Sequence, residues 1–506
     1  MYSEFDEIVV GAGSSGAALT ARLATTGRRV LLVEAGPDYP DQSQLPHDLR
    51  NGNTPSMVLH DWGFVGFRDD GAELSLPRGR VVGGCSAINS CIALRPQPDD
   101  FADWKGWSWP EVLPFLRGLE ADADFDGPHH GTVGPLAVRR RNSAEWSAIS
   151  AALVKAAGAA GFPSTADHNA PDATGVGAVP LNLTTDGQRI SVASAYLDAV
   201  RARPNLTILP DALVDKVLFA GSRAIGVRLI ADGQPRTVHA DRVTLCAGTY
   251  GTPTILQRSG VGPADLLRAL GVAVVADRPG VGSDLADHSQ VAIVLLPRPG
   301  LCDPADPCAE VVLRYTAPGS AVRNDMQLYA LNHVDLKVFA PHLASATPDG
   351  WAFMVTSNLM APRARGTVRA VSTDPAAPPR IEIDYGRDPE DLRRQREGVR
   401  LCWELLRQPA FAALTKAIID MDETTVHSDS ALDDFIRRAA VSAHHPTGTA
   451  RCGPPDDPTA VVDSRCGVYG TEGLRVADAS IIPVSPRANT NLVSIMIGER
   501  VATWSN

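Results

Sequence analysis

A glycine-rich turn near the N-terminus constrains the fold more than any other feature of the chain. The run EIVVGAGSSG, residues 7–16, has the pattern of a short buried strand that ends in three closely spaced glycines. Residues 15–26 are rich in alanine and indicate a helix, and the apolar run at 29–35 indicates a second strand. The order strand, helix, strand predicts a βαβ unit with a right-handed crossover.

The three glycines have the spacing GxGxxG and indicate that a dinucleotide binds at this turn. Gly11 permits the tight turn, Gly13 lets a pyrophosphate approach the backbone, and Gly16 lets the helix pack on the strand. The free N–H groups at the start of the helix attract phosphates. Glu34 ends the next strand, where a carboxylate accepts hydrogen bonds from ribose hydroxyls and repels a 2′-phosphate. The spacing alone is a weak signal, but between a strand and a helix it predicts FAD or NAD and argues against NADP.

Length, charge and cysteine spacing limit the class of protein. A chain of 506 residues is too long for one ordinary hydrophobic core, so we expect two lobes. A net charge of −11 argues against nucleic acid or an anionic membrane as the main partner. The acidic N-terminus is unlike a signal peptide, and no apolar run reaches the ~18 residues of a membrane span, so we expect a cytoplasmic protein. The eight cysteines lack metal-ligand spacing, and no metal site is predicted.

A second glycine-rich stretch, PRGRVVGGCSAINSCIALR at 77–95, combines paired glycines with other small residues. Such residues would let the backbone lie flat against a ring system. The residues by themselves are equally compatible with an ordinary loop.

Taken together in their order, the motifs of this chain resemble those of the glucose-methanol-choline (GMC) oxidoreductases. The ordered set is GAGSSG with Glu34, RGRVVGGCSAIN at 78–89, CAGTYGTPTILQRSGVGP at 246–263, RPGVGSDLADH at 278–288, HPTGTARCG at 445–453 and GLRVADASIIPVSPRANTNLVSIMIGERVA at 473–502. Each motif is moderately specific and the ordered set is highly specific. The resemblance is nearest to small bacterial oxidases of aryl or furan alcohols and to choline-oxidising members.

The resemblance implies FAD as the cofactor and supplies a set of binding residues. The positions that match the family's FAD contacts are Gly11, Gly13, Ser14, Ser15, Gly16, Glu34, Val82, Gly84, Asn89, Cys91, Val214, Ala247, Asp478 and Ala479. Choline-oxidising relatives bond the flavin covalently to a histidine where this chain has Ile88. Because isoleucine cannot form that bond, we expect non-covalent FAD.

The resemblance also implies two catalytic positions near the C-terminus. His445 precedes PTGT and matches the family base, which takes the proton of the alcohol because a neutral imidazole is a suitable acceptor near pH 7. The second family position is a histidine or an asparagine, and we place Asn491 there to orient the substrate oxygen. Paired histidines can also be core residues. Adjacent residues of an extended segment point to opposite faces, so His444 would face away from the substrate, toward the core or toward the flavin. Asn489 would share a face with Asn491 if that segment is extended, but capping of a helix is the simpler role for Asn489.

The expected fold class is α/β with two lobes. We expect a Rossmann-like FAD-binding domain and a discontinuous substrate domain built on an antiparallel sheet. The FAD-binding domain would comprise 1–150, 191–296 and 441–506, the last with the catalytic residues. The substrate domain would comprise 151–190 and 297–440.

The expected activity is FAD-dependent oxidation of a primary alcohol to an aldehyde, with hydride transfer to flavin N5. The partners would be a small alcohol and either oxygen, which gives hydrogen peroxide, or another electron acceptor. The alternative is an FAD-containing hydroxynitrile lyase without net redox. A NAD-dependent reductase and a nucleotide-binding protein without catalysis agree less well with the motifs.

Several features of the substrate side stay open at the level of sequence. Alternation along 325–334 would turn either Met326 and its alternate neighbours or Tyr329 and its alternate neighbours to the cavity. Trp62 and Phe64 fit the active-site entrance or a separate apolar cluster. The alcohol and the oligomeric state are undecided.

Overall fold

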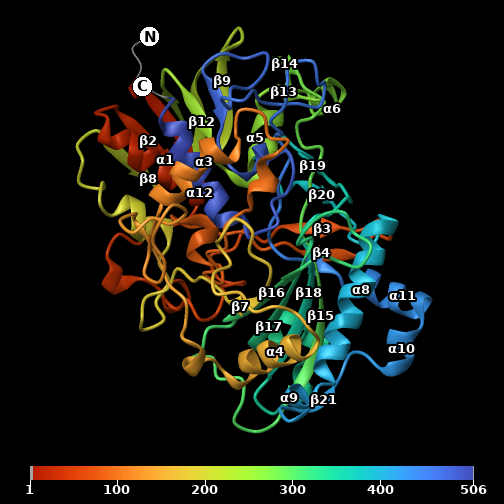
Figure 1. Ribbon diagram of the computed structural model, residues 1–506. Coiled ribbons are helices and arrows are strands. Elements are labelled where there is room, and N and C mark those ends of the chain that lie inside the picture. Colours follow the sequence, from red (N-terminus) through yellow and green to blue (C-terminus); the bar gives the residue numbers. More distant parts are fainter. Residues whose placement is uncertain (1–3, 505–506) are drawn as a thin grey trace.

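The structure, a computed structural model, describes residues 4–504 and contains a five-stranded parallel sheet near the top of Figure 1. Its strand order is β23 (Leu474–Val476), β12 (Val243–Leu245), β1 (Glu7–Val10), β2 (Val30–Val33) and β8 (Leu206–Leu209). All four pairings are parallel. The predicted βαβ unit is therefore confirmed at the centre of this sheet, and segments from both ends of the chain build it.

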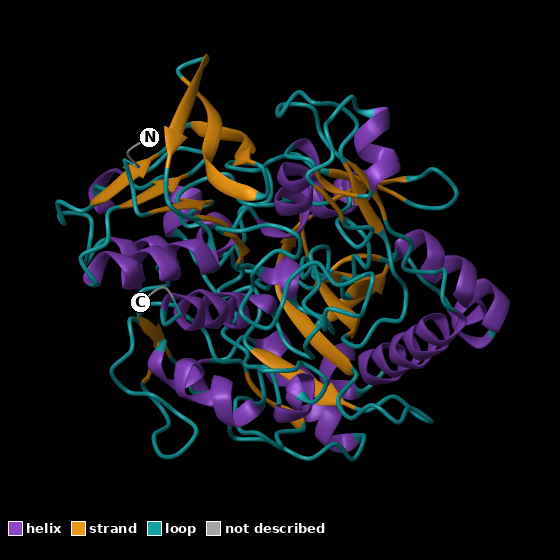
Figure 2. Cartoon of the chain, turned by 90° about the horizontal axis from the view of Figure 1, so that it is seen from above, coloured by secondary structure: helices purple, strands orange, loops and turns teal. Residues whose placement is uncertain are grey.

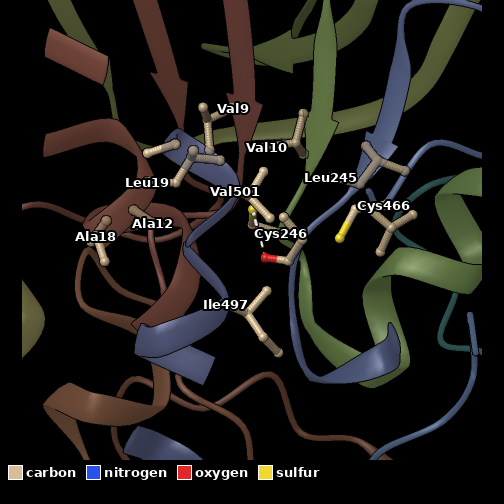
Figure 3. Packing of buried hydrophobic residues seen from close by; sticks show 14 of the residues in the cluster. Val9, Val10, Ala12, Ala18, Leu19, Leu245, Cys246, Cys466, Ile497 and Val501 are labelled. Atoms are coloured by element: carbon tan, nitrogen blue, oxygen red, sulfur yellow. Dashed lines mark hydrogen bonds between the residues drawn. The ribbon is translucent and has the colours of Figure 1, made fainter. Parts of the chain in front are cut away.

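Two helices from opposite ends of the chain pack together against this sheet. Helix α1 (Ser14–Thr25) follows the glycine-rich turn, and α12 (Thr490–Ala502) contacts it along its length. The approach is close because a Cβ on Gly498 would lie 2.2 Å from the main-chain oxygen of Ser15. Figure 3 shows the core that results, with Leu19 of α1 and Ile497 of α12 among its buried side chains. The last segment of the chain is thereby fixed beside the first turn.

The second main sheet is antiparallel and has seven strands, which occupy the lower part of Figure 1. The path runs through β21 (Thr415–Ile418), β15 (Ser289–Pro297), β18 (Trp351–Leu359), β17 (Met326–Asp335), β16 (Val311–Tyr315) and β7 (Gly175–Ala178), and β22 (Val441–Ser442) pairs with β15. The expectation of an antiparallel substrate sheet is confirmed. Strand β15 also lies in this sheet, although the expected boundary at 296 placed most of it in the FAD-binding domain. No glycine or proline within 289–296 marks the point where the chain passes from one domain to the other.

Helices cover this sheet on its outer side. Helix α8 (Pro389–Leu406) contacts β18 and β15, and α4 (Ala148–Ala159) contacts β17 and β16. The amphipathic pattern at 388–408 predicted α8, which begins where the Asp388 carboxylate accepts hydrogen bonds from the first turn and Pro389 occupies the first helical position. Seen from above, helices lie at both sides of the molecule with strands between them (Figure 2).

Smaller elements connect the two sheets. They include the four-stranded sheet of β19 (Thr367–Arg369), β20 (Arg380–Glu382), β3 (Val65–Phe67) and β4 (Glu73–Ser75), the antiparallel strands β9 (Ala212–Ala220), β10 (Arg223–Ala231) and β11 (Gln234–His239), and the helices α3 (Trp109–Gly118), α5 (Gly248–Arg258) and α11 (Asp429–Ala439). Strand β18 thus belongs to the antiparallel sheet, whereas β19 and β20, which follow it in the chain, belong to the four-stranded sheet. No helix within residues 4–504 has the length and apolar character needed to cross a membrane.

A buried ionic cluster lies beside the parallel sheet. Its members are Arg95, Glu120, Asp122, His130, Arg140 and Asp167. His130 Nε2 lies 2.9 Å from an Asp167 carboxylate oxygen, and Nδ1 lies 3.2 Å from oxygens of Glu120 and Asp122. These three carboxylates raise the pKa of His130 to about 10. With His130 protonated, the three cations of the cluster balance its three anions, and the exposed Asp124 adds a further carboxylate 3.5 Å from Arg140.

Candidate active site

One cavity of about 600 Å³ reaches from the glycine-rich turn to the C-terminal histidines. Its wall includes Gly11 and Glu34 from the parallel sheet, Tyr329 and Thr356 from the antiparallel sheet, and His445 from the loop after β22. A volume of this size is typical of sites for small molecules and cofactors. The two lobes therefore share one site, and each contributes a different end of it.

The two glycine-rich stretches meet at one end of the cavity. Gly84 has φ +51°, and a Cβ there would lie 2.6 Å from the Gly13 Cα. Gly11 has φ +101°, a conformation that residues with a side chain rarely adopt. It also lies against the main chain of Cys246, which leaves no space for a Cβ. With Gly13 as the N-cap of α1, the free N–H groups of the first helical turn point to the cavity end. This arrangement suits a pyrophosphate.

Glu34 lies in the wall beside this turn. Its carboxylate accepts hydrogen bonds from the main-chain N–H groups of Ala12, at 2.9 Å, and Gly36, at 3.0 Å. Burial raises the pKa of Glu34 to about 7, while these N–H groups oppose that shift. Its oxygens can still accept further hydrogen bonds from ribose hydroxyls. Val214 of β9 lies in the same part of the wall.

The structure brings most of the predicted FAD residues to the cavity. Those in its lining are Gly11, Gly13, Ser14, Ser15, Glu34, Gly84, Asn89, Val214, Ala247, Asp478 and Ala479. Gly16, Val82 and Cys91 lie behind the lining. A Cβ on Gly16 would lie 1.9 Å from the Gly11 carbonyl oxygen, which agrees with a packing role for Gly16. The buried Cys91 thiol lies 3.4 Å from the Arg189 guanidinium instead.

His445 lies at the other end of the cavity between two polar partners. Its Nε2 lies 3.0 Å from the Asn489 amide nitrogen, and its Nδ1 lies 3.1 Å from His288 Nδ1. Its main-chain N–H donates to the Asp287 carboxylate at 2.9 Å. Burial lowers the pKa of His445 well below its ordinary value, and the nearby positive charge of Arg78 acts in the same direction. His445 is therefore neutral at pH 7, as a proton acceptor must be.

The asparagine beside His445 is Asn489, and not Asn491 as the sequence suggested. Asn491 accepts a hydrogen bond from the Ser14 hydroxyl at 2.8 Å, and its amide nitrogen has no partner among the described residues. Asn489 is the N-cap residue of α12, yet within residues 4–504 its side chain caps no helix N–H. The helix begins at Thr490, so the alternation that would put both asparagines on one face does not apply.

Both adjacent histidines line the cavity, so of the two expected orientations of His444, toward the core or toward the flavin, the structure agrees with the one at the cavity. His444 has φ +68°, a left-handed conformation that breaks the alternation of an extended segment. Arg78 holds this conformation by donating to the main-chain carbonyl of His444 at 3.0 Å. Nothing in the local composition indicated such a turn.

The substrate side of the cavity is mostly apolar and aromatic. Along β17 the cavity is lined by Tyr329, Leu331 and His333 and, at the end of the strand, by Val334 and Asp335, whereas Met326, Leu328 and Ala330 lie in the core. This decides which face of the strand meets the cavity. Trp62 and Phe64 also line it and stack with ring centroids 5.6 Å apart, so their position at the cavity is established.

Comparison with known proteins agrees with this geometry. Two family models described as GMC oxidoreductase match residues 5–290 and 362–498. The chain belongs to the GMC oxidoreductase family. GMC oxidoreductases bind FAD, and the resemblance inferred from the ordered motifs is confirmed.

Relatives of this GMC oxidoreductase include enzymes named for different alcohols. It is 34% identical to 5-(hydroxymethyl)furfural oxidase from Methylovorus sp. (strain MP688), over 98% of both chains. It is 34% identical to an oxygen-dependent choline dehydrogenase from Stenotrophomonas maltophilia (strain R551-3), over 99% of this chain and 94% of that one. The crystal structure of pyridoxine 4-oxidase from Mesorbium loti superposes with a TM-score of 0.89 at 29% identity, over 99% of both chains. These relatives support FAD-dependent alcohol oxidation in general and lend no support to the lyase alternative.

The residues of this GMC oxidoreductase fit FAD on structural grounds as well. Gly13 and Gly84 lie in close contact and both line the cavity. Because neither has a side chain, the space beside them stays open for the cofactor. The unpartnered Asn491 amide nitrogen lies in the wall between this contact and His445 and can donate to the cofactor. Ser14 and Asn491, joined by their hydrogen bond, would hold the middle of FAD.

Proposed function

We propose that this GMC oxidoreductase oxidises a primary alcohol to an aldehyde, with His445 as the base and Asn489 as the group that orients the substrate oxygen. The observation that carries the proposal is a neutral imidazole whose Nε2 lies 3.0 Å from a carboxamide, in a cavity that continues to the nucleotide-binding turn. A positioned base of this kind typically contributes ~10²–10⁴-fold to the rate. Asn489 cannot act as a base because its amide does not take up a proton at these pH values.

The reaction removes two hydrogens from the alcohol. The hydroxyl proton passes to Nε2 of His445, and the carbon-bound hydrogen leaves with its electron pair, so that a C=O bond forms. FAD, when bound, supplies the acceptor of that hydride. Two of the relatives are named oxidases and a third is named oxygen-dependent, which supports oxygen as the final acceptor. Oxygen takes the two electrons with two protons and becomes hydrogen peroxide.

The cavity supports an uncharged alcohol with an apolar or aromatic body. Among the described residues in its lining, the carboxylates are Glu34, Asp335 and Asp478. Glu34 lies beside the nucleotide-binding turn, Asp335 accepts from the Lys337 N–H at 2.9 Å, and Asp478 accepts from the Gly248 N–H at 2.9 Å. Aromatic faces stack with aryl or furan alcohols. They also attract a quaternary ammonium group, but in this lining the carboxylates that would add to that attraction already accept main-chain hydrogen bonds.

The test is an alcohol panel on purified holoenzyme. We expect a yellow protein whose flavin absorbance is bleached anaerobically by benzyl-type or furan-type alcohols and much less by choline, with peroxide released when air returns. The flavin should pass into the supernatant on acid precipitation because Ile88 cannot anchor it covalently. The variant His445→Ala should lose ~10²-fold or more in kcat with an unchanged flavin spectrum.

Two results would contradict the proposal. Near-normal turnover in His445→Ala would remove the assigned base. Release of aldehyde and cyanide from a cyanohydrin without any bleaching would instead establish the lyase.

A further inference from the structure

His288 contacts the ring of the proposed base on the side opposite to Asn489. It lies directly before β15, and its side chain is fully buried. The two rings meet edge to face, with centroids 5.1 Å apart and an interplanar angle of 69°. The Nδ1–Nδ1 distance of 3.1 Å is that of a hydrogen bond, so one of these nitrogens must donate and the other accept.

The partner of Nε2 decides which nitrogen donates. The Asn489 amide nitrogen can only donate, so Nε2 of His445 must be the unprotonated acceptor. The Asn489 oxygen lies 3.4 Å from the Tyr329 hydroxyl, whose proton is donated to Gln327 Oε1 at 2.9 Å. A neutral His445 then carries its proton on Nδ1 and donates it to His288, which must carry its own proton on Nε2.

We propose that His288 is a positioning residue that fixes His445 in the Nδ1–H tautomer, which leaves Nε2 unprotonated beside Asn489, on the side from which it can take the substrate proton. This inference rests on the proposed role of His445 as the base. The role is comparable to that of the carboxylate behind a catalytic histidine, but a neutral imidazole performs it here.

The carboxylate next in sequence is engaged elsewhere. Asp287 accepts from the His445 main-chain N–H at 2.9 Å and from the Tyr385 hydroxyl at 2.8 Å, and it accepts from the Ser442 hydroxyl as well. It holds the backbone of the base while His288 holds the ring. Burial lowers the pKa of His288 to about 3, so His288 stays neutral and can accept the Nδ1 proton.

The arrangement also serves the charged form of the base. When His445 takes the substrate proton, its ring becomes a cation and Nδ1 still donates to His288. A hydrogen bond from a charged donor is roughly twice as strong as a neutral one. His288 therefore binds His445 more strongly after proton transfer than before it, which favours the transition state.

Ring-nitrogen NMR of the holoenzyme tests the tautomers directly, without reference to turnover. With ¹⁵N-labelled histidine, the signals of His445 and His288 are identified among the twelve histidines by their loss in His445→Gln and His288→Asn. We expect an N–H at Nδ1 of His445 and at Nε2 of His288. An N–H at Nε2 of a neutral His445 would overturn the inference even if the enzyme proved to oxidise no alcohol.

Kinetics of two His288 variants give the second measurement. His288→Asn keeps an acceptor oxygen near the place of Nδ1 and should retain most of kcat, whereas His288→Leu should lose about fivefold or more in kcat at nearly unchanged KM, the rate equivalent of one lost hydrogen bond. In His288→Leu the NMR signals of His445 should show both tautomers.

The matched control is His168→Leu. His168 is also fully buried, its ring nitrogens have no partner within the described chain, and burial lowers its pKa to about 3 as well. Equal kcat in His288→Leu and His168→Leu would show that His288 only fills space and would refute the proposal. Loss of kcat without any change in the His445 tautomer would refute it as well.

Discussion

His445 and the two asparagines of the NTN stretch show how single residues divide the work of the site. Asn489 lies against Nε2 of the base, and Asn491 is joined to Ser14 at the start of α1. The two amides are two residues apart but face different parts of the cavity. We therefore assign substrate orientation to Asn489 and contact with the cofactor to Asn491.

Substituting each asparagine separately tests this division. Asn489→Ala should lower kcat by about tenfold or more, the equivalent of one lost orienting hydrogen bond, and should leave FAD bound. Asn491→Ala should instead weaken FAD binding, measured as the dissociation constant by flavin fluorescence, with a smaller effect on kcat of the saturated enzyme. The reverse pattern would restore Asn491 as the partner of the base.

For single residues, the sequence predicted which residue types form the site better than it predicted where their side chains lie. The motif around His445 led to the proposed base, and Gly11, Gly13, Ser14 and Ser15 of the glycine-rich turn line the cavity, while Gly16 lies behind it. The choice between Asn489 and Asn491 depended on where α12 begins, which local sequence does not specify to the residue. His288 lay in a motif that was noted, but its contact with His445 spans 157 positions and has no local signal.

At the scale of elements, the contact between the two glycine-rich stretches shapes the cofactor end of the cavity. Turn 11–16 leads into α1, and the loop at 78–89 lies against it through Gly13 and Gly84. The sequence predicted the strands and helix around the first turn because their apolar periods are regular. It left the second stretch undecided between a ring-binding surface and a loop, because the pairing of distant glycines is a tertiary property.

Gly84→Ala tests this contact. The added Cβ would meet the Gly13 Cα at 2.6 Å at a position with φ +51°, so the two stretches must separate. We expect a loss of FAD occupancy of at least tenfold, measured by flavin absorbance per protein. Gly118→Ala at the end of α3 is the control, since its Cβ would meet nothing within 4 Å in the described chain and should leave occupancy unchanged. Full FAD occupancy in Gly84→Ala would show that the contact does not define the site.

At the scale of the whole molecule, the buried ionic cluster links stability to pH. The pKa of His130 is about 10 in the folded protein, against an ordinary value near 6.5. The folded state therefore binds this proton more tightly than the unfolded chain does. The stabilising contribution is fully present below about pH 6.5 and is lost as the pH rises toward about 10.

Thermal unfolding of the holoenzyme across this range checks the effect. The midpoint of His130→Gln should lie several degrees below that of the wild type at pH 6, and the difference should shrink by pH 10. A difference that stays constant from pH 6 to pH 10 would mean that the charge on His130 does not contribute. The sequence predicted two lobes from length and motifs, but not this cluster, since its members lie between residues 95 and 167 on a short strand and several loops whose contacts have no local signal.

The placement of α12 beside α1 has a consequence for biosynthesis. During translation the nucleotide-binding turn leaves the ribosome before β23 and α12, which complete its sheet and its packing. A nascent chain halted before residue 474 would lack one edge strand of the sheet and the polar groups of Asp478, Asn489 and Asn491 in the cavity wall. Flavin capture is therefore expected only once α12 has emerged, and ribosome-bound chains halted before residue 474 should carry no yellow chromophore.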